Sequence, residues 1–201
     1  MTAMKSLFDR TRVYVYADTP DVSTEGADGI AVTLLADNGL NLRGTDYDGL
    51  DALCRAYADG QLDVLLCIPA LDEEQIKLVA NCATRHAMWG RILFASAAHK
   101  TLDAIKGAYP EARITPICDE NMVRPWIYAA YMGAPAYCME AREILLDADA
   151  WGAPTVDRAH NANVCIFAHN ADDEDTVKAL VRVGCDAVLT HDAKMARALV
   201  W

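Results

Sequence analysis

The chain has 201 residues, 53% of them hydrophobic, and a formal net charge of −11 at pH 7. This length is enough for one substantial core, whereas two separate domains would each be small, so we expect a single domain over residues 1–201. The acidic balance argues against nucleic acid as a partner, since a phosphate-binding surface needs clustered Lys and Arg. The apolar runs are all shorter than the roughly 18–20 residues that cross a bilayer, which argues against a membrane span.

Two further features indicate a cytoplasmic protein. The N-terminal stretch MTAMKSLFDRTR has no continuous apolar run and no small-residue cleavage site, so it does not resemble a secretory signal. The seven cysteines are an odd number without a C-x-x-C pair, and most of them lie in apolar runs. This pattern is typical of buried, reduced thiols.

Short runs rich in Val, Ile, Leu and aromatic residues alternate along the chain with amphipathic segments. The runs are apolar throughout, which is typical of strands buried on both faces. We expect strands at residues 13–16, 30–34, 63–67, 92–95, 114–117, 136–139, 164–167 and 187–190. Apolar spacing of three and four predicts helices between them, with examples at 72–86, 101–109 and 172–183.

Start and stop signals support these helices. Asp72 precedes one helix, while Asn170 and Asp172 precede another that ends at Gly184. Repeated alternation of strand and helix implies parallel strands joined by right-handed crossovers. With about eight strands, the pattern favours a closed (β/α)8 barrel of the TIM type over an open doubly wound sheet.

The connection between the first two strands is unusual. The segment TPDVSTEGAD is too short and too rich in turn formers for a full crossover helix, so we expect that helix to be reduced or missing. A missing helix would leave the apolar backs of both strands uncovered. We therefore expect a homodimer, with Leu199, Val200 and Trp201 as contributors to its interface.

The C-terminal part of the chain carries a resemblance to the glycerophosphodiester phosphodiesterase family. The stretch VCIFAHN has Phe167 where the family has tryptophan and keeps its asparagine as Asn170, and GCDAVLT keeps Gly184, Asp186 and Thr190. Upstream, RILFASAAHKTLDAIKGAYPEA and GADGIAVTLLADNGL are similar to further family segments in order and spacing. The resemblance implies a barrel fold and a metal-dependent phosphodiester hydrolase of glycerophospholipid metabolism.

The residues that the family uses for catalysis are mostly not matched. Its first strand ends in His-Arg-Gly, with an acid/base histidine and a phosphate-binding arginine, and its second carries a metal-binding Glu-x-Asp. A later His-Asp supplies the second acid/base histidine, and the third strand carries Glu-x-Lys. The corresponding positions here read Tyr16-Ala17-Asp18, Ala31-Val32-Thr33, Thr45-Asp46 and Cys67-Ile68-Pro69. The resemblance implies a calcium or magnesium cofactor, but such a cation needs several oxygen ligands, and these replacements remove them.

Polar residues at the ends of the predicted strands are the remaining candidates, because barrel chemistry lies at the C-terminal ends of strands. We take Asp18, Asp46, His169 and His191 as catalytic candidates. Glu140, His169 and His191 end three successive strands, so a relocated His-His-carboxylate metal site is geometrically conceivable.

The ligand-binding candidates are Ser96, Phe167 and Asn170. A structural role is the competing interpretation for such residues, since helix N-termini need caps and Asp192 and Asn170 suit that role. We expect His86, His99 and His160 to lie on helices remote from the strand ends.

Two hypotheses remain. In the first, the chain is a catalytically degenerate family member, a pseudoenzyme or a barrel that binds a small phosphodiester or polar ligand. In the second, it is an active metal-dependent hydrolase whose site has moved to the later strands. Loss of the acid/base histidines and metal carboxylates favours the first hypothesis.

Overall fold

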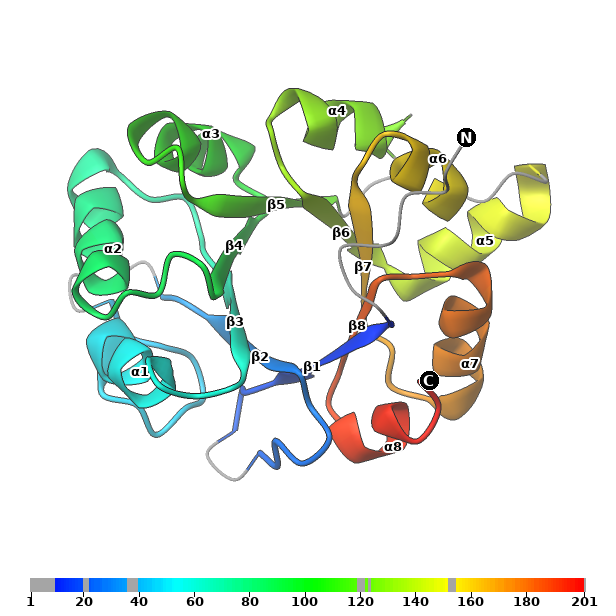
Figure 1. Cartoon of the computed structure of the whole chain (residues 1–201), viewed down its shortest axis with the longest axis horizontal. Helices are drawn as coiled ribbons and strands as arrows, with labels where there is room; N and C mark the ends of the chain where they lie inside the picture. Colours follow the sequence, from blue (N-terminus) through cyan, green and yellow to red (C-terminus); the bar gives the residue numbers. More distant parts are fainter. Residues whose placement is uncertain are drawn as a thin grey trace.

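A computed structural model describes residues 10–19, 22–35, 40–118, 122, 124–151 and 155–200, and in it eight parallel strands form one closed barrel (Figure 1). β1 pairs with both β2 and β8, which closes the sheet on itself. This confirms the predicted (β/α)8 barrel. The strands are β1 (Arg12–Tyr16), β2 (Gly29–Thr33), β3 (Asp63–Cys67), β4 (Ile92–Ser96), β5 (Arg113–Cys118), β6 (Ala136–Glu140), β7 (Cys165–His169) and β8 (Ala187–Thr190).

The helices lie outside the barrel and follow the strands in order (Figure 1). Two helices connect β6 to β7, and each of the remaining connections between β2 and β8 contains one helix. They are α1 (Gly49–Tyr57), α2 (Glu73–Arg85), α3 (His99–Ala108), α4 (Pro125–Tyr131), α5 (Ala141–Trp151), α6 (Thr155–Asn161), α7 (Glu174–Val183) and α8 (Ala193–Arg197). In the described ranges, none of these helices combines the length and apolarity needed to cross a bilayer.

The helix starts agree with the sequence signals in two cases of three. Asp72 forms a capping box at the start of α2, and Asp192 caps α8 by accepting a hydrogen bond from the Met195 N–H. For α7 the predicted end at Gly184 is confirmed, but the predicted start residues Asn170 and Asp172 are wrong, because the cap is Asp173, whose side chain accepts from the Thr176 N–H. Asn170 instead adopts the left-handed conformation, with φ of 60°, directly after β7.

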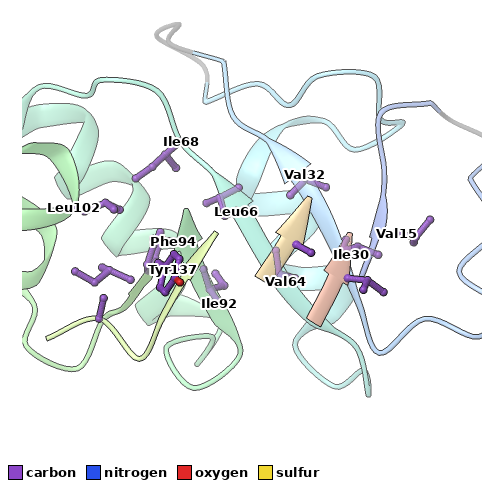
Figure 2. Close-up of a cluster of buried hydrophobic side chains, with 14 of the residues drawn as sticks. Val15, Ile30, Val32, Val64, Leu66, Ile68, Ile92, Phe94, Leu102 and Tyr137 are labelled. Carbon is purple, nitrogen blue, oxygen red and sulfur yellow. The ribbon is translucent and has the colours of Figure 1, made fainter. Parts of the chain in front are cut away.

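The core has two layers, one inside the barrel and one between the strands and the helices. Inside, Tyr14 and Phe167 lie with their ring centroids 5.7 Å apart among small side chains such as Ala31 and Ala187. Outside, branched and aromatic residues of the strands pack against the helices, as Figure 2 shows for Val64, Leu66 and Phe94 together with Leu102 of α3. This alternation along each strand directs every second side chain into the barrel.

The connection between β1 and β2 contains no helix among its described residues, 17–19 and 22–28, as predicted. The expected consequence is wrong, however. Val13, Val15, Ile30 and Val32, which form the backs of the two strands, are each at most 1% exposed. They belong to a cluster with buried leucines of the segment that leads into α1, among them Leu34, Leu40 and Leu42, and Val22 packs against the same cluster.

The apolar surface that was expected to require a second copy of the chain is thus already buried. Val200 is also buried in this cluster, with Leu199 partly buried against it, and Trp201 lies outside the described residues. A homodimer stays a prediction, but it has lost the physical reason given for it.

All seven cysteines are free thiols, six of them buried and Cys67 half-buried. This agrees with the expectation of buried, reduced cysteines.

Candidate functional site at the C-terminal end of the barrel

The C-terminal ends of the strands bring together several of the side chains that the sequence singles out. Tyr16, Thr33 and Cys67 each lie two residues beyond an interior residue of the same strand, namely Tyr14 of β1, Ala31 of β2 and Leu65 of β3. Since residues i and i+2 of a strand share a face, these side chains line the C-terminal end of the barrel interior, which we call the mouth. Glu140 and His169 occupy the same position on β6 and β7. These are the positions at which a barrel of this type carries its chemistry.

Tyr16 is a neutral hydrogen-bonding residue in this mouth. Its hydroxyl oxygen accepts a 3.3 Å hydrogen bond from the Asn170 N–H, and its ring lies 4.6 Å from that of His191. Burial raises the pKa of Tyr16 well above its usual value, and the nearby Cys138 and Cys67 add to this. A phenol with such a pKa keeps its proton at neutral pH and offers it as a hydrogen-bond donor.

His191 follows β8 and is held by Asp172 from the β7–α7 loop. One Asp172 oxygen, Oδ1, lies 3.0 Å from His191 Nδ1 and accepts hydrogen bonds from the His191 N–H at 2.8 Å and the Thr190 hydroxyl at 3.1 Å. Partial burial of the ring opposes protonation, but the hydrogen bond and charge of Asp172, together with the charge of Asp18, raise the pKa of His191 above its usual value. His191 therefore carries more positive charge near neutrality than an isolated histidine.

Asp18 approaches the other side of the same ring. Its Oδ2 lies 3.4 Å from His191 Nε2, and the side chains of Asp18 and His191 are 49% and 54% exposed. The Asp18 backbone packs against Gly44, where φ is 68° and an added Cβ would lie 1.7 Å from the Asp18 carbonyl oxygen. Asp46 is exposed and lies two residues beyond Gly44 in the chain.

Glu140 and His169 are register partners on β6 and β7, and both are half-buried. A cavity of about 360 Å3 opens beside them and is lined by Glu140, Arg142, Leu145, Asn170 and Thr176, among others. Arg142, the Thr176 side chain and the Asn170 amide are groups that recognise anionic or polar ligands, while Leu145 adds an apolar wall. Asn170 also borders the mouth through its bond to Tyr16.

Ser96 and Phe167, the other predicted ligand-binding residues, are buried. The Ser96 hydroxyl is 1% exposed; it donates to the Ile68 carbonyl at 2.7 Å and accepts from the Ala98 N–H at 3.0 Å. These bonds join the ends of β3 and β4. Phe167 is 1% exposed in the barrel interior, one layer below the mouth.

The mouth residues of the first three strands do not fit a hard divalent cation. Burial raises the pKa of Cys67 to about 11, so this thiol stays protonated, and Tyr16 and Thr33 supply no carboxylate. In the described part of the chain, no group of three or more His, Cys, Asp and Glu side chains is arranged to hold a metal ion. A metal site at Glu140, His169 and His191 stays a prediction.

One sequence prediction about the histidines is wrong. His99 begins α3, but its Nε2 lies 3.0 Å from the Ile117 carbonyl oxygen of β5, so it is close to a strand end. His86 lies beside Asp51 at the end of α2, and His160 lies beside Asp186, away from the mouth as expected.

The sequence reasoning also missed Asp172 as a partner of His191 and Tyr16 as its stacking neighbour. Asp172 was taken as part of a helix start. Its contact with His191 spans 19 residues, which no local pattern reveals.

Comparisons with known proteins agree with this fold. The sequence model described as the glycerophosphoryl diester phosphodiesterase family matches residues 62–195. No curated protein matches the sequence.

Among solved structures, a glycerophosphodiester phosphodiesterase of Galdieria sulphuraria, described as putative, is 12% identical, with 94% of this chain and 96% of that chain covered and a TM-score of 0.77. A glycerophosphodiester phosphodiesterase of Agrobacterium tumefaciens is 14% identical, with 94% and 98% covered and a TM-score of 0.71. An Oleispira antarctica phosphodiesterase in complex with the product sn-glycerol-3-phosphate is 13% identical, with 94% and 97% covered and a TM-score of 0.67.

Proposed function

Because this chain belongs to the glycerophosphoryl diester phosphodiesterase family, we propose that it is a member that binds a small phosphate-bearing or polar ligand at the barrel mouth and does not hydrolyse glycerophosphodiesters. The observation that carries the proposal is the set of side chains at the ends of the first three strands. Tyr16, Thr33 and Cys67 stand where the resemblance expects an acid/base histidine and metal-binding carboxylates.

The chemistry of these three groups supports the proposal. Proton transfer to a leaving alcohol needs a group that titrates near neutrality, and the pKa of Tyr16 and that of Cys67 are both raised far above that range. Threonine carries no charge and is a poor ligand for calcium or magnesium. At these three positions the chain therefore offers neither a group that titrates near neutrality nor a carboxylate.

Other features of the same end of the molecule support ligand binding. The cavity beside Glu140 offers Arg142, Asn170 and Thr176, and its volume of about 360 Å3 suits a small molecule. The relative from Oleispira antarctica contains sn-glycerol-3-phosphate. This compound is accordingly the first ligand to test.

The test combines an activity assay with a binding assay on the purified protein. We expect no enzyme-like release of alcohol from glycerophosphocholine, with or without added calcium or magnesium, and measurable binding of sn-glycerol-3-phosphate by calorimetry. An active relative assayed in parallel is the positive control. A turnover of about 1 per second, the low end for typical enzymes, would overturn the proposal.

The relocated-site alternative has its own signature in the same assay. Activity that survives Asp46→Ala but is abolished by His169→Gln or His191→Gln, and that requires a divalent cation, would support a hydrolase built on the later strands. The observation that favours this alternative is the pairing of Glu140 on β6 with His169 on β7, which places the two side chains next to each other.

A further inference from the structure

We propose that His191 is an anion-binding residue of the barrel mouth. In this proposal the Asp18 carboxylate occupies the position beside His191 Nε2 that a small oxyanion such as phosphate would take, and so competes with that anion. The inference rests on the proposed function in one respect, namely that the ligand site lies at this end of the barrel. It assigns the recognition of the anion to the end of β8, and it assigns to Asp18 the role of weakening that recognition.

The His191 ring is fixed before any ligand arrives. Asp172 holds both its Nδ1 and its backbone N–H through a single oxygen, and the Tyr16 ring lies 4.6 Å from it. The chain on either side is also fixed, because the Asp192 N–H donates to the Thr190 hydroxyl and the Asp192 side chain caps α8. Nε2 is then the polar atom of the ring that remains for an anion, and the side chain is 54% exposed.

The two aspartates differ in how they hold this ring. Asp172 contacts His191 at 2.8 and 3.0 Å, whereas Oδ2 of Asp18 lies 3.4 Å from Nε2 of His191. The latter distance is beyond the usual range of a strong charge-assisted hydrogen bond. Asp172 therefore positions the ring, and Asp18 is the partner that another anion can replace.

The position of Asp18 does not depend on His191. Its backbone packs directly against Gly44, so the carboxylate stays near the rim when an anion takes its place. A displaced but nearby carboxylate repels the incoming anion, which weakens binding. Replacing Asp18 by a neutral residue should thus strengthen anion binding.

A second donor is carried by the neighbouring Tyr16 ring, whose centroid lies 4.6 Å from that of His191. Tyr16 keeps its proton, and its hydroxyl oxygen already accepts from the Asn170 N–H. The Tyr16 O–H can therefore donate to an oxyanion that sits on His191. A phosphate ion can accept bonds from both groups at once through its several oxygens.

The experiment measures binding of inorganic phosphate by calorimetry and by the NMR shift of the His191 ring protons in the wild type and in three variants. We expect Asp18→Asn to tighten binding about fivefold, from the modest size of exposed charge interactions, and His191→Gln to weaken it about tenfold or more. Asp46→Asn is the matched control, because it removes the same charge from an exposed side chain close in sequence to Gly44, which packs against the Asp18 backbone. It should change the affinity by less than about twofold.

Three outcomes would overturn the inference. One is equal tightening in Asp18→Asn and Asp46→Asn, since this would be an effect of net charge alone. Another is phosphate binding that His191→Gln leaves unchanged, and the third is no binding by Asp18→Asn at all. Thermal denaturation of each variant shows whether it is folded, and a misfolded Asp18→Asn is replaced by Asp18→Ser.

Failure of the proposed function is distinguishable from these results. Hydrolysis of glycerophosphocholine by the wild type would overturn the proposed function, while the ratio of phosphate affinities between Asp18→Asn and Asp46→Asn would still report on His191. A parallel titration with sn-glycerol-3-phosphate separates the two sources of the anion. Tighter binding than phosphate indicates a phosphate monoester, and equal binding indicates the free ion.

Discussion

The Arg197 guanidinium donates a 2.6 Å hydrogen bond to the Asp28 carboxylate, which joins the end of α8 to the turn before β2. Asp28 is only 9% exposed, and it also accepts from Arg10 at 2.8 and 3.1 Å and from the Val13 N–H at 2.9 Å. Arg197 donates in addition to the Gly26 carbonyl. Since the β1–β2 connection has no helix in its described residues, these bonds hold the connection against the barrel.

We expect Asp28→Ala to lower the free energy of unfolding by about 3 kcal/mol, because it leaves two arginines around an empty, largely buried position. Urea denaturation measures this change. Glu73→Ala removes the exposed pair with Lys77 and is the matched control, for which a much smaller effect is expected. Equal losses in the two variants would contradict a special role for Asp28.

The second prediction concerns His160 and the pH dependence of stability. His160 Nε2 lies 2.7 Å from Oδ2 of Asp186, whose side chain is 1% exposed and which also accepts from the Ile166 N–H. The hydrogen bond that His160 donates to the Asp186 carboxylate raises the pKa of His160 above its usual value. The stabilisation from the charged pair is then fully present below the unfolded-state pKa of about 6.5 and is lost as the pH rises through the folded-state pKa.

The measurement is urea denaturation of the wild type and of His160→Gln at a series of pH values. We expect the advantage of the wild type to shrink as the pH rises above about 6.5. Glutamine keeps a neutral donor at this position, so the stability of His160→Gln should lack the pH-dependent contribution of the charged pair. A difference that is constant over the series would show that the charge of His160 contributes nothing.

The third prediction concerns Gly44 and the rim. Gly44→Ala places a Cβ 1.7 Å from the Asp18 carbonyl oxygen and forces alanine into a φ of 68°. We expect a loss of more than about 1 kcal/mol of stability, together with a shift of the Asp18 and His191 NMR signals. Gly107→Ala in α3, where an added Cβ meets nothing within 4 Å, is the control and should be neutral or stabilising. Similar losses in both variants would contradict the close approach.

Much of the fold could be predicted from the sequence because strands buried on both faces are apolar throughout. The run over β3 was predicted with the bounds that the structure has, Asp63–Cys67. Where strands carry polar residues into the mouth the prediction ended early, as in β7, which continues beyond Phe167 to His169. Backbone pairing with β6 extends β7 through these residues, and the composition of a single strand does not reveal that pairing.

The candidate site could be predicted only in part. His169, His191, Asp18 and Asn170 were correctly placed at the strand ends, since their positions follow from the strands. The pairing of His191 with Asp172 and Tyr16 depends on how the end of β1, the β7–α7 loop and the residue after β8 meet in space, and no periodicity carries that information. The cover over β1 and β2 was missed for the same reason, because it comes from leucines beyond β2 in the chain.

The pairing of β1 with β8 has a consequence for how the chain folds. β1 forms its second set of backbone bonds with the last strand of the barrel, and beside it the Thr11 hydroxyl donates to the Cys185 carbonyl, 174 residues away. During synthesis β1 can pair with β2 early, but its other edge stays open until β8 has left the ribosome. Contacts so distant in sequence slow folding, and the nascent chain carries an unpaired strand edge while all the residues between β1 and β8 are translated.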